Sequence, residues 1–295
     1  MTASEHYEVF ALRYARMTQR RTHDNFMHRD VHDGPMPMDF FVWIIRNAHR
    51  VILIDTGFGP GASASRGRPL DIDPVDALER IGIPADGVSD IVLTHLHYDH
   101  AGNLDRFPHA TVHVQDAEMA FATGRCMCHS VMRHPYDVDD VVTCVRRVHA
   151  GQVCFHDGDA EIFPGVSVHL LPGHSKGLQA VKVATARGPI LLASDASHYY
   201  ANFERGSPFV ITVDVAATLE SYARMRQLVE SDQHIIPGHD PLVGERYPSR
   251  VVNGVRLIEL HVAPEKVADV CIERPKPEAD THRGVLAAIL PAASS

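Results

Sequence analysis

The densest group of potential metal ligands lies in residues 94–103, where three imidazoles and one carboxylate fall within six residues: His95, His97, Asp99 and His100. An apolar run at 91–93 precedes them and is typical of a buried strand. His95 and His97 are two positions apart, so in an extended segment both side chains point the same way and can hold one cation together. Asp99 and His100 follow a turn and can face a second cation. The spacing favours a catalytic dinuclear site, because structural zinc prefers closed, cysteine-rich shells.

Three later segments show the same arrangement, an apolar strand that ends in a turn bearing a ligand-type side chain. His174 follows the strand 166–171, Asp195 follows the strand 189–194, and His239 ends a short strand within 233–240. We expect these ends to meet the first one if the strands share one sheet edge. Asp55, at the end of the strand 51–57, either orients a metal-binding imidazole or only caps the turn at Gly57.

Other potential ligands give weaker patterns. Residues 124–137 contain Cys126, Cys128, His129 and His134. Their spacing matches no standard zinc framework, so an irregular insert near the mouth of the site is favoured over a second metal site. We expect His109 and His113 to be solvated or packed rather than metal-bound.

The composition limits the class of protein. The chain has 295 residues, 45% hydrophobic and 22% charged, and a net charge of −9 with histidine neutral, which disfavours nucleic acid as a partner. No apolar run is long enough to span a membrane, and residues 1–6 lack the features of a signal peptide. The five cysteines are odd in number and indicate no disulfide framework. These features predict a cytoplasmic protein.

The elements that must position these ligands follow from apolar periodicity and turn residues. We expect strands at 7–16, 40–45, 51–57, 91–93, 111–114, 153–155, 166–171, 179–183, 189–194 and 233–240. Helices are expected at 73–81, 116–123, 138–149 and 214–230, with a short one at 104–107. Residues 17–38, rich in methionine towards their end, and the Gly, Ser and Arg-rich residues 58–72 are predicted to be loops. Residues 262–295 are expected to form a tail.

At these motifs the sequence resembles the metallo-β-lactamase superfamily. Residues 95–100 are similar to its His-x-His-x-Asp-His signature, and the segments around His174, Asp195 and His239 are similar to its later ligand motifs, in the same order. The resemblance covers about residues 40–245. It implies one hydrolase domain over 1–295 of the α/β (α+β) class, an αββα sandwich of two mixed β-sheets flanked by helices.

The resemblance also implies a ligand for each metal position. The first metal would bind His95, His97 and His174, the second would bind Asp99, His100 and His239, and Asp195 would bridge them beside a hydroxide. The two divalent ions would be Zn²⁺, although His and Asp donors also suit Mn²⁺, Fe²⁺ or Co²⁺. Such a pair activates water at neutral pH and stabilises a tetrahedral oxyanion, and Asp99 or Asp195 could pass a proton to the leaving alkoxide.

Single positions indicate which branch of the superfamily the sequence resembles. His97 stands where flavodiiron oxidoreductases have Glu, which favours hydrolysis, and Asp195 stands where true β-lactamases have Cys or Ser. The segments 96–103, 195–197 and 202–204 resemble the N-acyl-homoserine lactonases most closely. In those enzymes a tyrosine three residues after the bridging aspartate contacts the lactone carbonyl. Here that position is His198, which either donates the same hydrogen bond or leaves it to Tyr199.

These observations predict a dinuclear metal hydrolase that opens a lactone ring by metal-bound hydroxide. The expected substrate is a small molecule, an N-acyl-homoserine lactone, and the activity would be quorum quenching. The acyl pocket would be walled by residues 27–41 and 125–137. One alternative is hydrolysis of another lactone, an ester, a glyoxalase II-like thioester or a cyclic amide. A second is a non-catalytic metal-binding protein. No membrane or nucleic-acid partner is expected, and the oligomeric state is left open.

Overall fold

A computed structural model describes residues 6–28 and 32–265 of the chain. Strand β2 (Met38–Arg46) lies at the centre of the architecture because both of its faces are buried. Phe40, Val42 and Ile44 pack into one hydrophobic cluster, and Phe41 and Trp43 pack into another. A strand buried on both faces reads as a continuous apolar run, which explains the sequence pattern here.

β2 belongs to the larger of two mixed β-sheets. The strand order is β12-β13-β1-β2-β3-β4-β5-β6. The bounds are β1 Glu8–Met17, β3 Val51–Ile54, β4 Asp90–Val92, β5 Thr111–Gln115, β6 Val153–His156, β12 Ser249–Val252 and β13 Val255–Glu259. The strands β3 to β6 pair in parallel, and the remaining pairs are antiparallel.

The smaller sheet has the order β11-β10-β9-β8-β7. Its bounds are β7 Ala160–Phe163, β8 Val166–Leu170, β9 Gln179–Thr185, β10 Gly188–Ser194 and β11 Ile235–Pro237. Only β10 and β11 pair in parallel among these strands of the described chain. Apolar side chains of both sheets, Trp43 and Val181 among them, share one buried cluster, so the sheets stack face to face.

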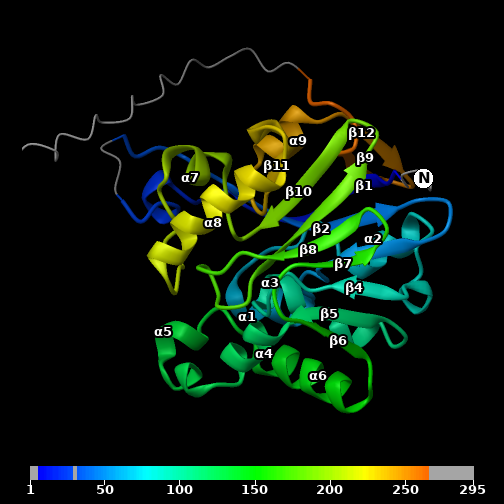
Figure 1. The fold of residues 1–295 in the computed structure, drawn as a ribbon, viewed down its shortest axis with the longest axis horizontal. Helices are drawn as coiled ribbons and strands as arrows, with labels where there is room; N and C mark the ends of the chain where they lie inside the picture. The colour runs from blue at the N-terminus through cyan, green and yellow to red at the C-terminus, as the bar shows by residue number, and fades with distance from the viewer. Residues whose placement is uncertain (1–5, 29–31, 266–295) are drawn as a thin grey trace, which may run out of the picture. The chain divides into compact units, whose positions relative to one another are not determined.

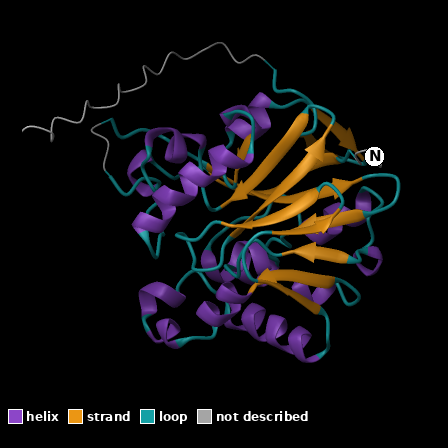
Figure 2. Ribbon diagram, viewed as in Figure 1, coloured by secondary structure: helices purple, strands orange, loops and turns teal. Residues whose placement is uncertain are grey.

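Helices cover the outer faces of both sheets (Figures 1 and 2). The α-helices are α1 Pro60–Arg66, α2 Pro74–Arg80, α3 Tyr98–Ala101, α4 Asp116–Ala122, α5 Ser130–Arg133, α6 Val138–His149, α7 Tyr200–Arg205, α8 Val215–Leu228 and α9 Leu242–Arg246. The 3₁₀ turns are Thr22–Asp24, Ala85–Gly87, Leu104–Arg106, Arg125–Cys128 and Asp232–His234. Side chains of α2, α4 and α6 pack on the larger sheet, and those of α7, α8 and α9 join the cluster of the smaller sheet. The predicted αββα sandwich is confirmed.

The local predictions hold where apolar periodicity is strong and fail where it is weak. The loop prediction for 58–72 is wrong, because α1 occupies part of it. Pro60 stands at the first helical position, and Gly67 ends the helix in the left-handed region at φ 61°. The strands β7, β12 and β13 and the helices α7 and α9 carried no prediction. β1, β12 and β13 also extend the larger sheet outside residues 40–245.

Two further predictions concern the chain as a whole. None of the helices among the described residues is both long and apolar enough to cross a bilayer. The predicted tail, 262–295, lies outside the described residues except for its first four positions.

Candidate metal centre

The candidate ligands follow strands of both sheets. His95 follows β4 of the larger sheet, whereas His174, Asp195 and His239 follow β8, β10 and β11 of the smaller one. The expectation that one sheet edge carries them all is therefore wrong. Face-to-face stacking brings the carboxyl ends of β4, β8, β10 and β11 together, so each sheet supplies part of the cluster.

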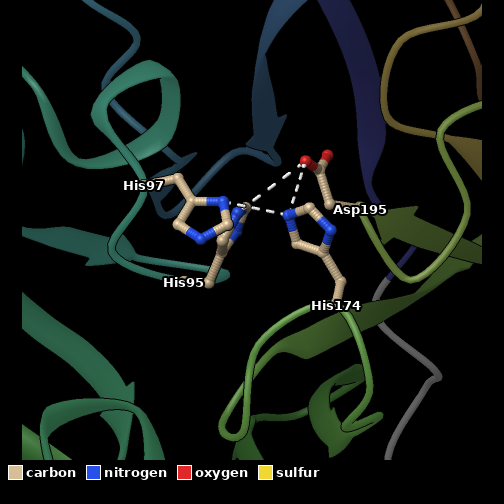
Figure 3. A group of neighbouring side chains, drawn as sticks. All are labelled: His95, His97, His174 and Asp195. Atoms are coloured by element: carbon tan, nitrogen blue, oxygen red, sulfur yellow. Dashed lines mark hydrogen bonds and ion pairs between the residues drawn. The ribbon is translucent and has the colours of Figure 1, made fainter. Parts of the chain in front are cut away.

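One group contains His95, His97, His174 and Asp195, which point toward one another from three loops, the first of which carries both His95 and His97 (Figure 3). All four are buried, and their ligand atoms lie within 4.8 Å of one another. His174 Nε2 lies 3.2 Å from Asp195 Oδ2 and 2.9 Å from His97 Nδ1. His95 Nε2 lies 3.7 Å from the same carboxylate oxygen. Two of the imidazoles therefore face one oxygen of Asp195, and His97 adjoins them through His174.

The other carboxylate oxygen of Asp195 faces a second group, formed by Asp99, His100 and His239. Asp195 Oδ1 lies 2.9 Å from His239 Nε2 and 3.4 Å from His100 Nε2. Asp99 Oδ2 lies 3.8 Å from each of these two nitrogens. The structure thus brings together all seven residues singled out as ligands, with Asp195 between the two groups.

Hydrogen bonds outside the cluster orient its imidazoles. His100 Nδ1 lies 2.7 Å from Asp55 Oδ2, His174 Nδ1 2.7 Å from the Ile211 carbonyl, and His239 Nδ1 2.7 Å from the Asp39 carbonyl. Each ring donates its Nδ1–H to one of these acceptors, so its Nε2 lone pair faces the cluster. Of the two readings of Asp55, orientation of an imidazole is the one that the geometry supports.

The donor set fits a divalent cation. His95 Nε2 and His100 Nε2 are buried and have no hydrogen-bond partner in the described part of the chain. Burial lowers the pKa of His95 and His97 well below the usual value and that of His174 to about 3, whereas the facing carboxylates, Asp195 first, raise the pKa of His100 and His239. A neutral imidazole is the form that binds metal. A cation among these side chains would give the unpartnered nitrogens of His95 and His100 a partner.

Glu118 in α4 fixes the two ligand loops together, a role that carried no prediction from the sequence. Its carboxylate, fully buried, accepts hydrogen bonds from Leu96 N at 2.9 Å, Ser175 Oγ at 2.6 Å, Gly177 N at 3.1 Å and Tyr136 Oη at 3.2 Å. A Cβ at Gly177 would lie 2.0 Å from Glu118 N, so only glycine allows this approach. No local pattern marks a helical glutamate for this role.

We expect Glu118→Gln to destabilise the fold, because an amide NH₂ would face two of these donors. Each buried donor left unsatisfied costs about 1–3 kcal/mol, and each kcal/mol lowers Tm by about 2–4 °C in a chain of this size. Thermal unfolding with matched metal content measures the change. Glu220→Gln on the exposed side of α8 is the control, with an expected change within about 0.5 kcal/mol. Equal Tm values for the two variants would contradict the role of Glu118.

His198 lies inside the cluster and Tyr199 outside it. His198 Nε2 is 3.0 Å from Asp195 Oδ2, and its ring stacks on Phe209 with centroids 3.6 Å apart. Burial lowers the pKa of His198 to about 4. The Tyr199 hydroxyl instead donates to the Pro37 carbonyl at 3.2 Å. Of the two residues, His198 is the one positioned to meet a molecule at the cluster.

The segment 124–137 is an irregular insert of short helical turns beside the first ligand loop. Its Pro135 carbonyl accepts a hydrogen bond from Tyr98 N at 2.9 Å, and the Tyr136 ring packs edge-on against His97. Within residues 6–28 and 32–265, Cys126, Cys128, His129 and His134 belong to no group of converging ligand atoms. The insert therefore borders the candidate metal centre, to which it contributes packing against His97.

The fold and this ligand set define the class. The sequence model of the metallo-β-lactamase superfamily matches residues 41–239, and the chain belongs to that superfamily. Among its relatives, an N-acyl homoserine lactonase of Bacillus thuringiensis is 33% identical over 171 residues, which are 56% of this chain and 61% of the relative. The match thus spans about three fifths of that relative's length. The lactonase AiiB of Agrobacterium fabrum is 27% identical over 223 residues, 67% of this chain and 78% of AiiB.

Solved structures show the same fold. A quorum-quenching N-acyl homoserine lactone lactonase superposes with a TM-score of 0.65 at 25% identity and covers 80% of this chain and 92% of that one. The hydrolase AbOPH superposes with a TM-score of 0.67 at 17% identity, over 91% of this chain and 97% of AbOPH. At the latter identity the likeness speaks for the fold alone.

Proposed function

We propose that this protein is a dinuclear metal hydrolase that opens the ring of N-acyl-homoserine lactones. The observation that carries the proposal is the convergence of seven His and Asp side chains into two groups that share Asp195. The relatives support the substrate class, because relatives such as those from Bacillus thuringiensis and Agrobacterium fabrum are named N-acyl homoserine lactonases. A solved lactonase of the same fold is described as quorum-quenching, and quorum quenching is the role that we propose for this chain.

The two groups assign the ligands. His95, His97 and His174 would hold one cation, Asp99, His100 and His239 would hold the other, and each oxygen of Asp195 faces one group. Zn²⁺ suits these donors, and Mn²⁺, Fe²⁺ and Co²⁺ share the preference. When bound, such a pair lowers the pKa of water and polarises a carbonyl oxygen.

The chain itself supplies positioning and proton transfer. His198 would donate a hydrogen bond to the lactone carbonyl oxygen, since its ring is fixed against Phe209 and faces Asp195. Asp99 is the most exposed carboxylate of the cluster, with 11% of its side chain accessible. It can therefore exchange a proton with a bound molecule and pass it to the alkoxide that leaves as the ring opens.

We expect the purified protein loaded with Zn²⁺ to release acid from N-hexanoyl-homoserine lactone in a pH-stat. Ring opening yields a carboxylic acid, so one proton appears for each lactone consumed. Chelation should abolish the activity and added Zn²⁺ should restore it, because the proposed reaction needs the cations that these side chains hold. Metal analysis of the same samples should give about two ions per chain.

A parallel panel separates the alternatives. It contains a simple γ-lactone, an aryl ester, a glutathione thioester and a cyclic amide. Turnover of a thioester or amide with the homoserine lactones left intact would overturn the substrate class but retain the hydrolase. A metal-loaded protein without turnover on any member would favour a non-catalytic metal-binding protein.

A further inference from the structure

A second group of metal-type ligands lies on the outer strands of the larger sheet. His113 in β5 and Cys154 and His156 in β6 place their ligand atoms within 4.8 Å of one another. His113 pairs with Cys154 in the parallel register, so both side chains leave the same face, and His156 is two positions along β6. None of the three residues belongs to the seven-residue candidate metal centre.

The hydrogen bonds of His113 leave the lone pair of its Nδ1 directed at the other two ligands. His113 Nε2 donates a hydrogen bond to Asp90 Oδ1 at 3.2 Å. The ring therefore carries its proton on Nε2, and Nδ1 is a bare acceptor. His156 Nε2 lies 3.1 Å from that Nδ1.

We propose that His113 Nδ1, His156 Nε2 and the Cys154 thiolate bind a divalent, thiophilic cation, Zn²⁺, at a site distinct from the candidate hydrolytic centre. Asp90 orients His113 from outside, in the carboxylate–histidine–metal arrangement common at zinc sites. Two imidazoles and one thiolate are a set that Zn²⁺ accepts, with a fourth position for water. Binding releases the thiol proton of Cys154 to solvent. The thiolate and the Asp90 carboxylate then balance the two positive charges.

The position of the group indicates what the cation does. β6 is the last strand of its sheet, and each of its side chains is half-buried or exposed. Its attachment to β5 therefore depends mainly on backbone pairing. A cation held by one residue of β5 and two of β6 joins the strands through their side chains, and Asp90 extends the connection to β4. A bound cation would thus connect the edge strand β6 to β5 and β4.

Cobalt substitution tests the site with a signal that the other centre cannot give. Thiolate ligation to Co²⁺ produces a charge-transfer absorption in the near ultraviolet, and none of the seven residues proposed for the hydrolytic centre is a cysteine. We expect the full-length protein, made metal-free and titrated with Co²⁺ under a non-thiol reductant, to show this absorption. It should disappear when Zn²⁺ is added in excess.

Matched variants assign the signal to its residues. Cys154→Ser should lose the absorption and about one metal ion per chain, and Zn²⁺ should no longer raise its Tm beyond the rise given by the other centre. A Cys126→Ser, Cys128→Ser double variant should behave as the parent. Cys271 is present in this variant and in Cys154→Ser, so it cannot explain a difference between them. Because Cys154 is exposed, its replacement should not prevent folding. The proposal is overturned if the absorption is absent from the parent protein or persists in Cys154→Ser. Lactone hydrolysis is not the readout, so failure of the proposed function leaves this test intact.

Discussion

Replacing Asp195 with asparagine is expected to lower kcat/KM for the lactone by a factor on the order of 10³ or more, about 4 kcal/mol of transition-state stabilisation. The two oxygens of Asp195 face different imidazole groups, with Oδ2 3.2 Å from His174 Nε2 and Oδ1 2.9 Å from His239 Nε2. An asparagine keeps the shape but offers one oxygen, and its NH₂ cannot bind a cation. Metal content should therefore fall together with activity, and both are measured on the same preparation.

Asp240→Asn is the matched control for this replacement. Asp240 is also buried and adjoins His239 in sequence, but its oxygens accept hydrogen bonds from Tyr200 N at 3.0 Å and Leu242 N at 2.9 Å. The control should lose stability and keep its metal and its activity within a few-fold. An Asp195→Asn protein that retained both metals and full turnover would refute the bridging role.

The first ligand loop could be proposed from sequence because its information is local. His95 to His100 span one strand end and the first turn of a short helix, so spacing alone indicates which side chains can act together. The likeness to a known family then linked this loop to His174, Asp195 and His239. Composition and periodicity alone give no register between β4 and the smaller sheet. The sequence pattern therefore predicted one sheet edge, whereas two sheets contribute ligands.

Contacts between distant segments that no motif marks could not be predicted. Glu118 is an ordinary helical glutamate until its carboxylate is seen to accept hydrogen bonds from both ligand loops. His113 was expected to be packed or solvated, and only the parallel pairing of β5 with β6 places it beside Cys154. The helix α1 was missed for another reason, because its Gly and Ser content hid the helix start at Pro60 and the stop at Gly67.

The second large prediction concerns position 198, where this chain has His198 and the lactonase family has tyrosine. We expect His198→Phe to lower kcat/KM by about 10²–10³, the usual effect of removing one donor to a developing oxyanion. The phenyl ring can keep the stacking on Phe209, so the loss would come from the ring nitrogens. His198→Tyr should recover much of the activity, because it restores a hydrogen-bond donor of the kind that the lactonase family carries at this position.

Metal analysis of the same variants separates two roles for this imidazole. His198 Nε2 is 3.0 Å from Asp195 Oδ2, and its ligand atom also converges with those of Asp195 and His239. A substrate donor would leave the metal content of His198→Phe unchanged and reduce only turnover, whereas a metal ligand would reduce both. Tyr199→Phe is the control, since that hydroxyl is bonded to the Pro37 carbonyl, and its activity should stay within a few-fold of the parent. If Tyr199→Phe loses activity and His198→Phe does not, the carbonyl donor is Tyr199, and the position of His198 beside Asp195 serves packing instead.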